Sequence, residues 1–276
     1  MLVDFTKMEG LRNDFIIIDR RGKKLSLGKA EFKQIADRRL GIGCDQILLI
    51  GNTSRADVDF SYAVVNGDGS FASHCGNGLR CVALYLRNRN EIGDRASAEI
   101  GGSVYHVEVL SENQIKVNMG VPDFLPENIG LFSKSISERY TFSIDGSEVV
   151  YGAVSIGNPH AVIEVKSLID TDVPTIGKKF QSDAGFRNGV NVGFFEFLND
   201  SSITLRVWER GVGDTPACGT GACAAVAVGV QRGILSQAVS VKQQGGDLLI
   251  EWDGQKGSNL MMTGTARHVF EGKITL

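Results

Sequence analysis

Two stretches of the chain, HCGNGLRCVALYL at residues 74–86 and ACGTGACAAVAVG at residues 217–229, decide the fold. Each contains a cysteine, Cys75 or Cys218, with glycine at the next position and again two positions later. The two cysteines are 218 − 75 = 143 positions apart. Other segments recur in the same order at nearly the same spacing. We therefore expect an internal duplication.

Each recurring segment is an apolar or alternating run that lies beside a polar turn. Such runs are typical of β-strands. They pair as Asn13–Asp19 with Asn158–Glu164, Gly41–Leu49 loosely with Arg187–Phe195, and Val58–Val65 with Ile203–Trp208. Further strands are expected at 105–110, 114–120, 202–209, 238–244 and 247–252, and a helix at 31–40 that ends before Gly41.

The segments 79–86 and 222–230 predict helices, and the second has no polar face. A short helix that is apolar all round has to be surrounded by protein. The sequence therefore predicts an α+β fold of two similar domains, each a mixed or antiparallel, β-barrel-like sheet around a central helix. We expect one domain at residues 1–120 plus 265–276, carrying Cys75, and the other at 121–264, carrying Cys218.

Composition is that of a globular protein, with 276 residues, 42% hydrophobic, 22% charged and a formal net charge of −3. This balance gives no reason to expect nucleic acid or a membrane surface as partner. No apolar run approaches the ~20 residues of a membrane span, and the first residues lack a secretion signal, so a cytoplasmic location is expected.

The five cysteines are an odd number, which favours free thiols in a reducing compartment over a disulfide framework. Their spacings, C-x5-C and C-x4-C, differ from a zinc knuckle, so no metal is expected. We interpret Cys44, Cys81 and Cys223 as buried structural residues. We interpret His74, His106 and His268 as solvated or hydrogen-bonded side chains.

The C-G-x-G motif explains why Cys75 and Cys218 are candidates for chemistry. Glycines let the backbone turn sharply at the start of a helix, where the first N–H groups have no intrahelical partner. The same end of the helix favours negative charge, including a thiolate or a bound carboxylate. If two such sites face each other, one thiolate removes a proton from carbon while the opposite thiol delivers one, which inverts a stereocentre.

At these residues the sequence closely resembles diaminopimelate epimerases, which interconvert LL- and meso-2,6-diaminoheptanedioate without pyridoxal phosphate. The family motif C-G-N-G-x-R-C is present at Cys75–Cys81, and A-C-G-T/S-G-x-x-A at Ala217–Ala224. Short motifs GxGxDQ, GNPH and ERG extend the resemblance over essentially the whole chain. It implies the same two-domain fold, no cofactor, and Cys75 and Cys218 as the acid–base pair.

The resemblance also implies roles for polar residues. His160 and Glu209 match positions that assist the cysteines, and Arg210 suits a bidentate grip on a carboxylate. The other positions implied to bind the amino-acid substrate are Asn13, Gln46, Asn66, Gly76, Asn77, Asn158, Asn191, Glu209, Gly219 and Thr220. Four of them, Gly76, Asn77, Gly219 and Thr220, are implied to offer backbone N–H groups where the helices start. Without the resemblance, Asn13, Asn158 and Asn191 would be interpreted as turn residues beside strands, and Glu209 with Arg210 as a surface ion pair.

Three positions need separate mention. Arg12 stands where the family usually has glycine, and His74 where it often has methionine. Either substitution could alter the site. Phe270 matches an aromatic residue that supports homodimer packing, so the resemblance implies a homodimer.

Other functions remain open from the residues. Proline racemases and hydroxyproline epimerases share the fold and the paired cysteines, but their first motif resembles C-G-H-G and Ser-Pro precedes the second. Phenazine-pathway isomerases lack the cysteine pair. A cysteine hydrolase would need a thiol, a histidine and an oxyanion hole, and it would leave the second motif unexplained. A non-catalytic amino-acid-binding protein would use the two helix starts to bind anionic groups.

Overall fold

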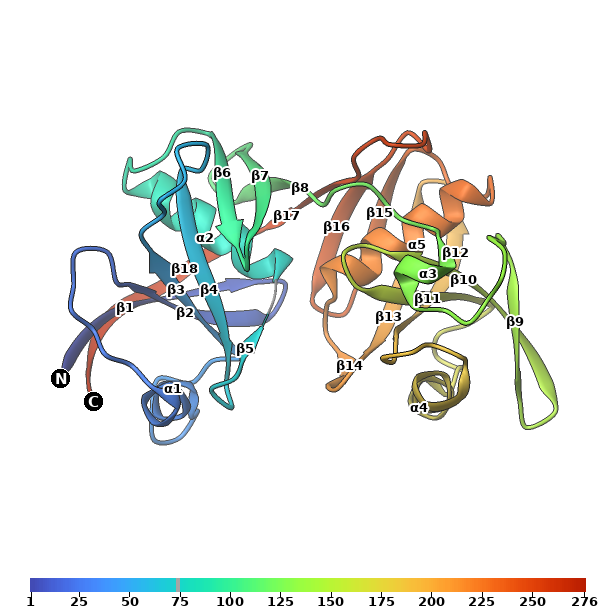
Figure 1. The fold of residues 1–276 in the computed structure, drawn as a ribbon, viewed down its shortest axis with the longest axis horizontal. Helices are drawn as coiled ribbons and strands as arrows, with labels where there is room; N and C mark the ends of the chain where they lie inside the picture. Colours follow the sequence, from blue (N-terminus) through green and yellow to red (C-terminus); the bar gives the residue numbers. More distant parts are fainter. Residues whose placement is uncertain (73–74) are drawn as a thin grey trace. The chain divides into compact units, whose positions relative to one another are not determined.

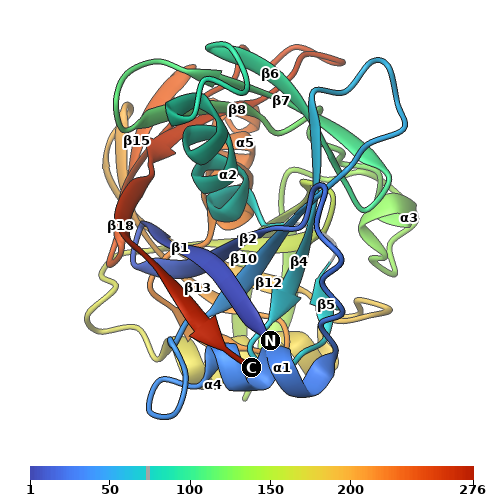
Figure 2. The same cartoon turned by 90° about the vertical axis from the view of Figure 1, so that its left-hand side faces the viewer.

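The computed structural model describes residues 1–72 and 75–276 and divides into two compact units. Unit 1 comprises Met1–Val117 and Thr263–Leu276, and unit 2 comprises Asn118–Met262. His74 lies outside the described residues. Both termini belong to unit 1, where the N–H of Leu276 donates to the carbonyl of Met1 at 2.9 Å (Figures 1 and 2).

The described residues of unit 1 form a β-sheet with helices packed against it (Figure 1). Its helices are α1 (Lys29–Ala36) and α2 (Gly76–Asn88). Its strands are β1 (Leu2–Gly10), β2 (Asn13–Asp19), β3 (Gln46–Gly51), β4 (Phe60–Asn66), β5 (Phe71–Ala72), β6 (Arg95–Ile100), β7 (Ser103–Val109), β8 (Gln114–Asn118), β17 (Met261–Thr265) and β18 (Arg267–Thr275), with β8 and β17 reaching the boundary of the unit.

Residues 147–251 of unit 2 repeat the order of elements that runs from β1 to β7 in unit 1, and further elements precede them. Its helices are α3 (Pro126–Ile129), α4 (Val173–Asp183) and α5 (Gly219–Gln231). Its strands are β9 (Tyr140–Ile144), β10 (Ser147–Ser155), β11 (Pro159–Val165), β12 (Asn191–Asn199), β13 (Ser202–Glu209), β14 (Gly213–Thr215), β15 (Ala238–Gln243) and β16 (Gly246–Glu251).

The strand pairing confirms the predicted duplication. In unit 1 the order is β18-β1-β2-β3-β4-β6-β7-β8, and in unit 2 it is β9-β10-β11-β12-β13-β15-β16. Two strand pairs are parallel in unit 1, β2–β3 and β4–β6. The pairs at the same places in unit 2, β11–β12 and β13–β15, are also parallel. Each unit is therefore a mixed sheet, and C-terminal β18 takes in unit 1 the place that β9 takes in unit 2.

The register corrects one predicted alignment. Phe15 pairs with Gln46 in unit 1, and His160 pairs with Asn191 in unit 2. Since 160 − 15 and 191 − 46 both give 145, Gln46 corresponds to Asn191. The loose alignment of Gly41–Leu49 with Arg187–Phe195 was wrong by one position, because hydrogen-bond register, not loop similarity, fixes which residues are equivalent.

The two central helices, α2 and α5, start one turn before the predicted 79–86 and 222–230 and include the glycines of the motif. Helix α2 lies within the curve of the unit 1 strands and contacts β1, β2, β3, β7 and β18 (Figure 2). Helix α5 contacts β10 to β13 and β16. A Cβ added at Gly229 of α5 would lie 2.2 Å from Leu235 Cδ1, so the absence of a side chain permits this packing.

A buried arginine, Arg80, fixes the start of α2. Its side chain is 0% exposed. Its Nε donates to the carbonyl of Thr265 at 3.2 Å, and its guanidinium donates to Asn77 Oδ1 at 2.9 Å. A buried charge requires such partners, since desolvation otherwise opposes burial. The side chain of Asn77 is therefore used inside the unit, and its backbone remains the candidate for ligand contact.

Helix α1 is shorter than the predicted 31–40. It begins at Lys29 and ends at Ala36, because Asp37 takes an extended conformation and its Oδ1 accepts the N–H groups of Arg39 and Leu40 at 2.7 and 2.8 Å. Helix α4 was not predicted. Its sequence signals are the N-cap Asp172, which accepts from Thr175 N, and a proline in the first turn.

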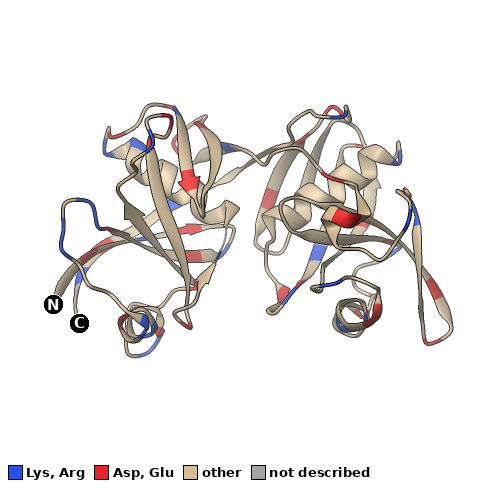
Figure 3. Ribbon diagram, viewed as in Figure 1, with Lys and Arg blue, Asp and Glu red and all other residues tan. Residues whose placement is uncertain are grey.

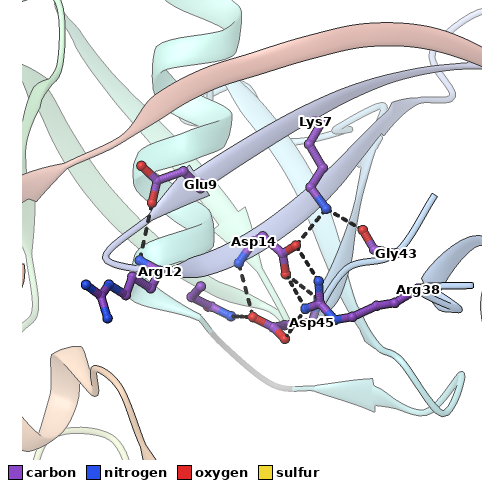
Figure 4. Close-up of polar contacts among 8 residues, drawn as sticks. Lys7, Glu9, Arg12, Asp14, Arg38, Gly43 and Asp45 are labelled. Atoms are coloured by element: carbon purple, nitrogen blue, oxygen red, sulfur yellow. Dashed lines mark hydrogen bonds and ion pairs between the residues drawn. The ribbon is translucent and has the colours of Figure 1, made fainter. Parts of the chain in front are cut away.

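The tight turn between β1 and β2 holds two residues in the left-handed region, Leu11 (φ 57°) and Arg12 (φ 63°). Arg12 is exposed, and its N–H donates to Glu9 Oε2 at 3.2 Å (Figure 4). Left-handed backbone costs an L-residue roughly 1–2 kcal/mol, which glycine avoids.

We expect Arg12→Gly to raise the free energy of unfolding by roughly 0.5–1 kcal/mol, the relief of strain being partly offset by the greater freedom of glycine in the unfolded chain. Urea denaturation of the two proteins measures this. Arg12→Ala is the matched control, because it removes the guanidinium and keeps the Cβ. An equal gain in Arg12→Ala would assign the effect to charge and contradict the strain explanation.

None of the helices in residues 1–72 and 75–276 is long and apolar enough to cross a membrane. Lysine and arginine are interspersed with aspartate and glutamate along both units (Figure 3).

Candidate active site

Cys75 is the N-cap residue of α2, with an extended backbone (φ −148°, ψ 107°). Its Sγ accepts the backbone N–H of Gly78 at 3.4 Å, the contact that a serine or aspartate side chain makes at this position. A Cβ at Gly78 would lie 3.0 Å from Leu48 Cδ2, so the absence of a side chain lets the first turn of α2 pack against β3. The half-buried thiol donates to Asn13 Oδ1 at 3.8 Å.

The predicted polar residues of unit 1 gather at one edge of the sheet. Asn13 opens β2 and Gln46 opens the parallel β3, while Asn66 ends the antiparallel β4, so all three lie at the same end. Gln46 Nε2 donates to Asn66 Oδ1 at 2.9 Å. Asn66 Nδ2 in turn donates to Ser70 Oγ at 3.0 Å. This edge offers amide groups beside the start of α2 and Cys75.

Cys218 occupies the equivalent N-cap position of α5 (φ −129°, ψ 110°) and is 5% exposed. Its backbone N–H donates to Gln243 Oε1 at 2.8 Å, and its Sγ lies 3.6 Å from Thr220 Oγ1. Burial raises the pKa of the Cys218 thiol well above its ordinary value. The charge of Glu209 raises this pKa further, and the hydrogen bond with Thr220 opposes the rise.

Glu209 is a largely buried carboxyl group whose side chain is hydrogen-bonded to that of Cys218. Burial raises the pKa of this carboxyl group, while hydrogen bonds with Thr215 and Cys218 lower it. The bond between the side chains of Glu209 and Cys218 raises the pKa of the thiol and lowers that of the carboxyl group, as expected for an S–H that donates to a carboxylate. The position equivalent to Glu209 in unit 1 is Asn66, since Val65 and Trp208 hold matching places in the two sheets.

His160 is fully buried in unit 2 and forms a hydrogen bond with the side chain of Asn158. Its Nε2 lies 3.0 Å from Asn158 Oδ1, and Asn158 Nδ2 donates to Thr220 Oγ1 at 3.5 Å. Burial lowers the pKa of His160 to about 3, and the charge of Arg210 adds to this effect. The ring is therefore neutral at pH 7. Two side chains, Asn158 and Thr220, connect it to Cys218.

The comparisons with known proteins are consistent over the whole chain. The sequence model of the family "Diaminopimelate epimerase" matches residues 5–125 and 152–269. A diaminopimelate epimerase of Teredinibacter turnerae is 42% identical over 277 residues and that of Alkalilimnicola ehrlichii 43% over 279, each alignment covering 100% of both chains. The chain belongs to the diaminopimelate epimerase family.

Solved structures with the same fold are more distant in sequence. A hydroxyproline epimerase from Agrobacterium vitis superposes with a TM-score of 0.70 at 12% identity, covering 99% of this chain and 92% of that one. A phenazine biosynthesis protein of the PhzF family from Bacillus anthracis gives 0.69 at 17% identity with full coverage of both. At these identities the likeness extends to the fold.

Two further positions suggested by resemblance to diaminopimelate epimerases have contacts of their own. The buried Asn191 uses Oδ1 to accept the backbone N–H of Arg210 at 2.8 Å. The exposed Arg210 directs its guanidinium to the carbonyl of Asn188 at 2.8 Å. Since Glu209 bonds Thr215 and Cys218 instead, Glu209 and Arg210 point to different partners, and the surface-pair interpretation is not supported.

Two residues near the cysteines, Asp45 and Gln243, were not predicted as site residues. Asp45 accepts from Asn13 Nδ2 at 3.0 Å, and Gln243 holds the backbone of Cys218. The signal for Asp45 was its place in the GxGxDQ motif, directly before Gln46. Nothing local marks Gln243, because it comes from β15 and reaches Cys218 only through the fold.

The remaining thiols fit a structural role. None of the five cysteines, each within the described residues, forms a disulfide bond. Cys44, Cys81 and Cys223 are buried, and burial raises the pKa of Cys44 to about 12 and that of Cys81 further. In residues 1–72 and 75–276 no group of three or more His, Cys, Asp or Glu residues is placed to hold a metal ion.

Proposed function

We propose that this protein is a cofactor-independent epimerase that interconverts LL- and meso-2,6-diaminoheptanedioate. The observation that carries the proposal is the pair of cysteines at equivalent helix N-caps, Cys75 on α2 and Cys218 on α5, in a chain of the diaminopimelate epimerase family. The relatives at 42–43% identity bear that activity in their names.

The reaction follows from two thiols used in turn. One cysteine, as thiolate, takes the α-proton and becomes a thiol, leaving a carbanion at the α-carbon. The other thiol gives its proton to the opposite face and becomes a thiolate. Donor and acceptor exchange roles with the direction of reaction. After one turnover the two cysteines have exchanged protonation states, and proton exchange with solvent restores the starting form.

Glu209 supports this chemistry from unit 2. Its carboxylate accepts the hydrogen bond of Cys218, so it can receive the thiol proton when Cys218 has to act as thiolate. We propose a supporting role for His160 through Asn158, whose NH₂ group points to Thr220 beside the sulfur. A neutral, buried imidazole holds an amide in place without adding charge.

Substrate recognition is proposed for the polar groups near each cysteine. A substrate with two amino-acid ends needs donors for two carboxylates and acceptors for two ammonium groups. Asn13, Gln46 and Asn66 offer these in unit 1, and Asn158, Asn191 and Arg210 in unit 2. The backbone N–H groups at Gly76, Asn77, Gly219 and Thr220 are proposed to bind carboxylate oxygens at the positive ends of the helices.

We also propose a homodimer in the cytoplasm, serving lysine and peptidoglycan precursor synthesis. Phe270 supports the dimer: it lies on β18, is 45% exposed and contacts the ring of Phe5 edge-to-face at 5.8 Å. Sedimentation over a range of protein concentrations tests the assembly.

The function is tested by incubating the protein with LL-diaminopimelate in D₂O, and in parallel with L-proline. We expect deuterium at the α-carbon of the meso product and none in proline. Inversion of proline alone would favour the racemase alternative. Absence of exchange from both substrates would favour a hydrolase or a binding protein.

A further inference from the structure

We propose that Asp45 is a positioning residue for Cys75, because its carboxylate turns the side-chain amide of Asn13 so that the carbonyl oxygen faces the thiol and keeps it protonated in the ligand-free protein. The inference deepens the function proposed above, and its catalytic meaning rests on that function. It concerns unit 1 only.

The orientation of the Asn13 amide follows from chemistry. A carboxylate accepts hydrogen bonds and donates none, so the group of Asn13 that lies 3.0 Å from Asp45 Oδ2 must be the NH₂. The opposite end of the amide is then the carbonyl oxygen, which lies 3.8 Å from Cys75 Sγ. A carbonyl oxygen accepts an S–H, whereas it repels a thiolate. Asn13 in this orientation therefore stabilises the thiol form of Cys75.

Asp45 is held in place by a network of opposite charges (Figure 4). Its Oδ2 also accepts the N–H of Asp14 at 3.1 Å, and its Oδ1 accepts from the Arg38 guanidinium at 2.7 Å. Arg38 binds both oxygens of Asp14, at 2.9 and 2.7 Å, and Lys7 binds Asp14 at 2.6 Å. Lys7 also donates to the carbonyl of Gly43. These salt bridges lower the pKa of the Asp14 carboxyl group far below its ordinary range.

The network contains two carboxylates and two cations, so it fixes geometry without adding net charge. Other ionisable groups near the cysteine lie on α2, β4 and β1. Cys75 raises the pKa values of Tyr62 and Cys81, and both Arg80 and Glu9 act on Cys81 in the same neighbourhood. These groups do not contact the Asn13 amide in the way that Asp45 does, so their influence is the same whichever way that amide points.

Unit 2 shows the opposite arrangement at the equivalent asparagine. The position equivalent to Asp45 is Val190, since Gln46 corresponds to Asn191. Without a carboxylate there, Asn158 presents its oxygen to His160 and its NH₂ to Thr220, beside Cys218. The two units thus turn equivalent amides in opposite senses, and the residue behind each amide decides which.

The test is Asp45→Asn, which keeps one acceptor oxygen and replaces the other by an NH₂ group. The new NH₂ must meet either the donors of Asn13 and Asp14 or the guanidinium of Arg38, so the Asn13 amide loses its fixed orientation. With its NH₂ free to face Cys75, the thiolate becomes favoured. We expect the pH midpoint of iodoacetamide alkylation of Cys75, followed by peptide mass spectrometry, to fall, with about a three- to tenfold faster reaction at pH 7.

A double substitution separates positioning from charge and from loosened structure. In the Asn13→Ala background, Asp45→Asn is expected to leave the midpoint unchanged. An equal shift with and without Asn13 would show a direct charge effect and overturn the proposal. A faster reaction at every pH with the same midpoint would show greater exposure only, and no change at all would also overturn it.

Two controls complete the experiment. Asp57→Asn removes another aspartate of unit 1 that pairs with an arginine, Arg55, at 2.7 Å, and it should leave Cys75 unaffected. If Asp45→Asn fails to fold, Asp45→Ser provides a smaller side chain at a position that is 43% exposed. Since alkylation uses ligand-free protein, the outcome is independent of whether the protein turns over diaminopimelate.

Discussion

Replacing Cys75 or Cys218 by serine is expected to lower the rate of epimerisation by about 10²- to 10⁴-fold, the contribution of a positioned acid or base. A serine hydroxyl loses its proton far less readily than a thiol, so it cannot take the role of base. Serine is also a preferred N-cap residue, and its oxygen can accept the N–H that Cys75 Sγ accepts from Gly78. The variants should therefore fold, and the loss can be assigned to chemistry.

The measurement is conversion of LL- to meso-diaminopimelate, with deuterium exchange at the α-carbon recorded in parallel. A variant with a single base can still remove a proton and return it to the same face, so exchange without inversion is expected from one epimer. Cys223→Ala, on α5 but fully buried, is the matched control and should retain activity. Near-normal inversion by either serine variant would contradict the two-base mechanism.

Protonation of His160 is expected to destabilise the protein in mild acid. The pKa of its buried ring is about 3, against 6.5 in the unfolded chain. Because the folded pKa is the lower one, stability is fully present above pH 6.5 and is lost as the pH falls toward 3. Below about pH 6 this residue alone should lower the free energy of unfolding by about 1.4 kcal/mol per pH unit.

Urea denaturation at pH 7, 6 and 5 measures the effect in the protein and in His160→Gln, which keeps an N–H for Asn158 and cannot be protonated. The difference between the two should shrink as the pH falls. Glu209 has the opposite effect on stability, because its raised pKa favours the folded protein at low pH. Both proteins contain Glu209, so its effect cancels in their difference. The exposed His106, changed to glutamine, is the control. A pH dependence unchanged in His160→Gln would refute the assignment.

The sequence was sufficient for the architecture because the features that specify it are local. Strands with alternating or apolar residues, and two C-G-x-G starts of apolar helices, recur in order, so the duplication could be recognised without coordinates. Cys75 and Cys218 could be placed at helix starts for the same reason. The prediction failed for the end of α1, where a side-chain cap competes with the apolar pattern. The helix ends at Ala36, before Asp37, four residues earlier than the apolar spacing predicted.

The tertiary structure decided how each amide and carboxylate is used. Asn13 and Asn158 hold equivalent positions in the duplication, yet their amides have different partners. The NH₂ group of Asn13 donates to Asp45, whereas the carbonyl oxygen of Asn158 contacts His160. Arg80 is buried because Asn77 and Thr265 satisfy it, although Thr265 is 185 positions away.

The sequence alone determined that Cys75 and Cys218 stand at helix N-termini. The reason is that residue type and spacing specify a helix start and a thiol in the same few positions. The surroundings of the two cysteines were not determined in this way. Cys218 faces a carboxylate and Cys75 faces a carbonyl oxygen, because Glu209 and Asn13 reach them from strands whose register is fixed only by the folded sheets. Hydrogen-bond direction depends on partners from distant segments, and no local pattern encodes those partners.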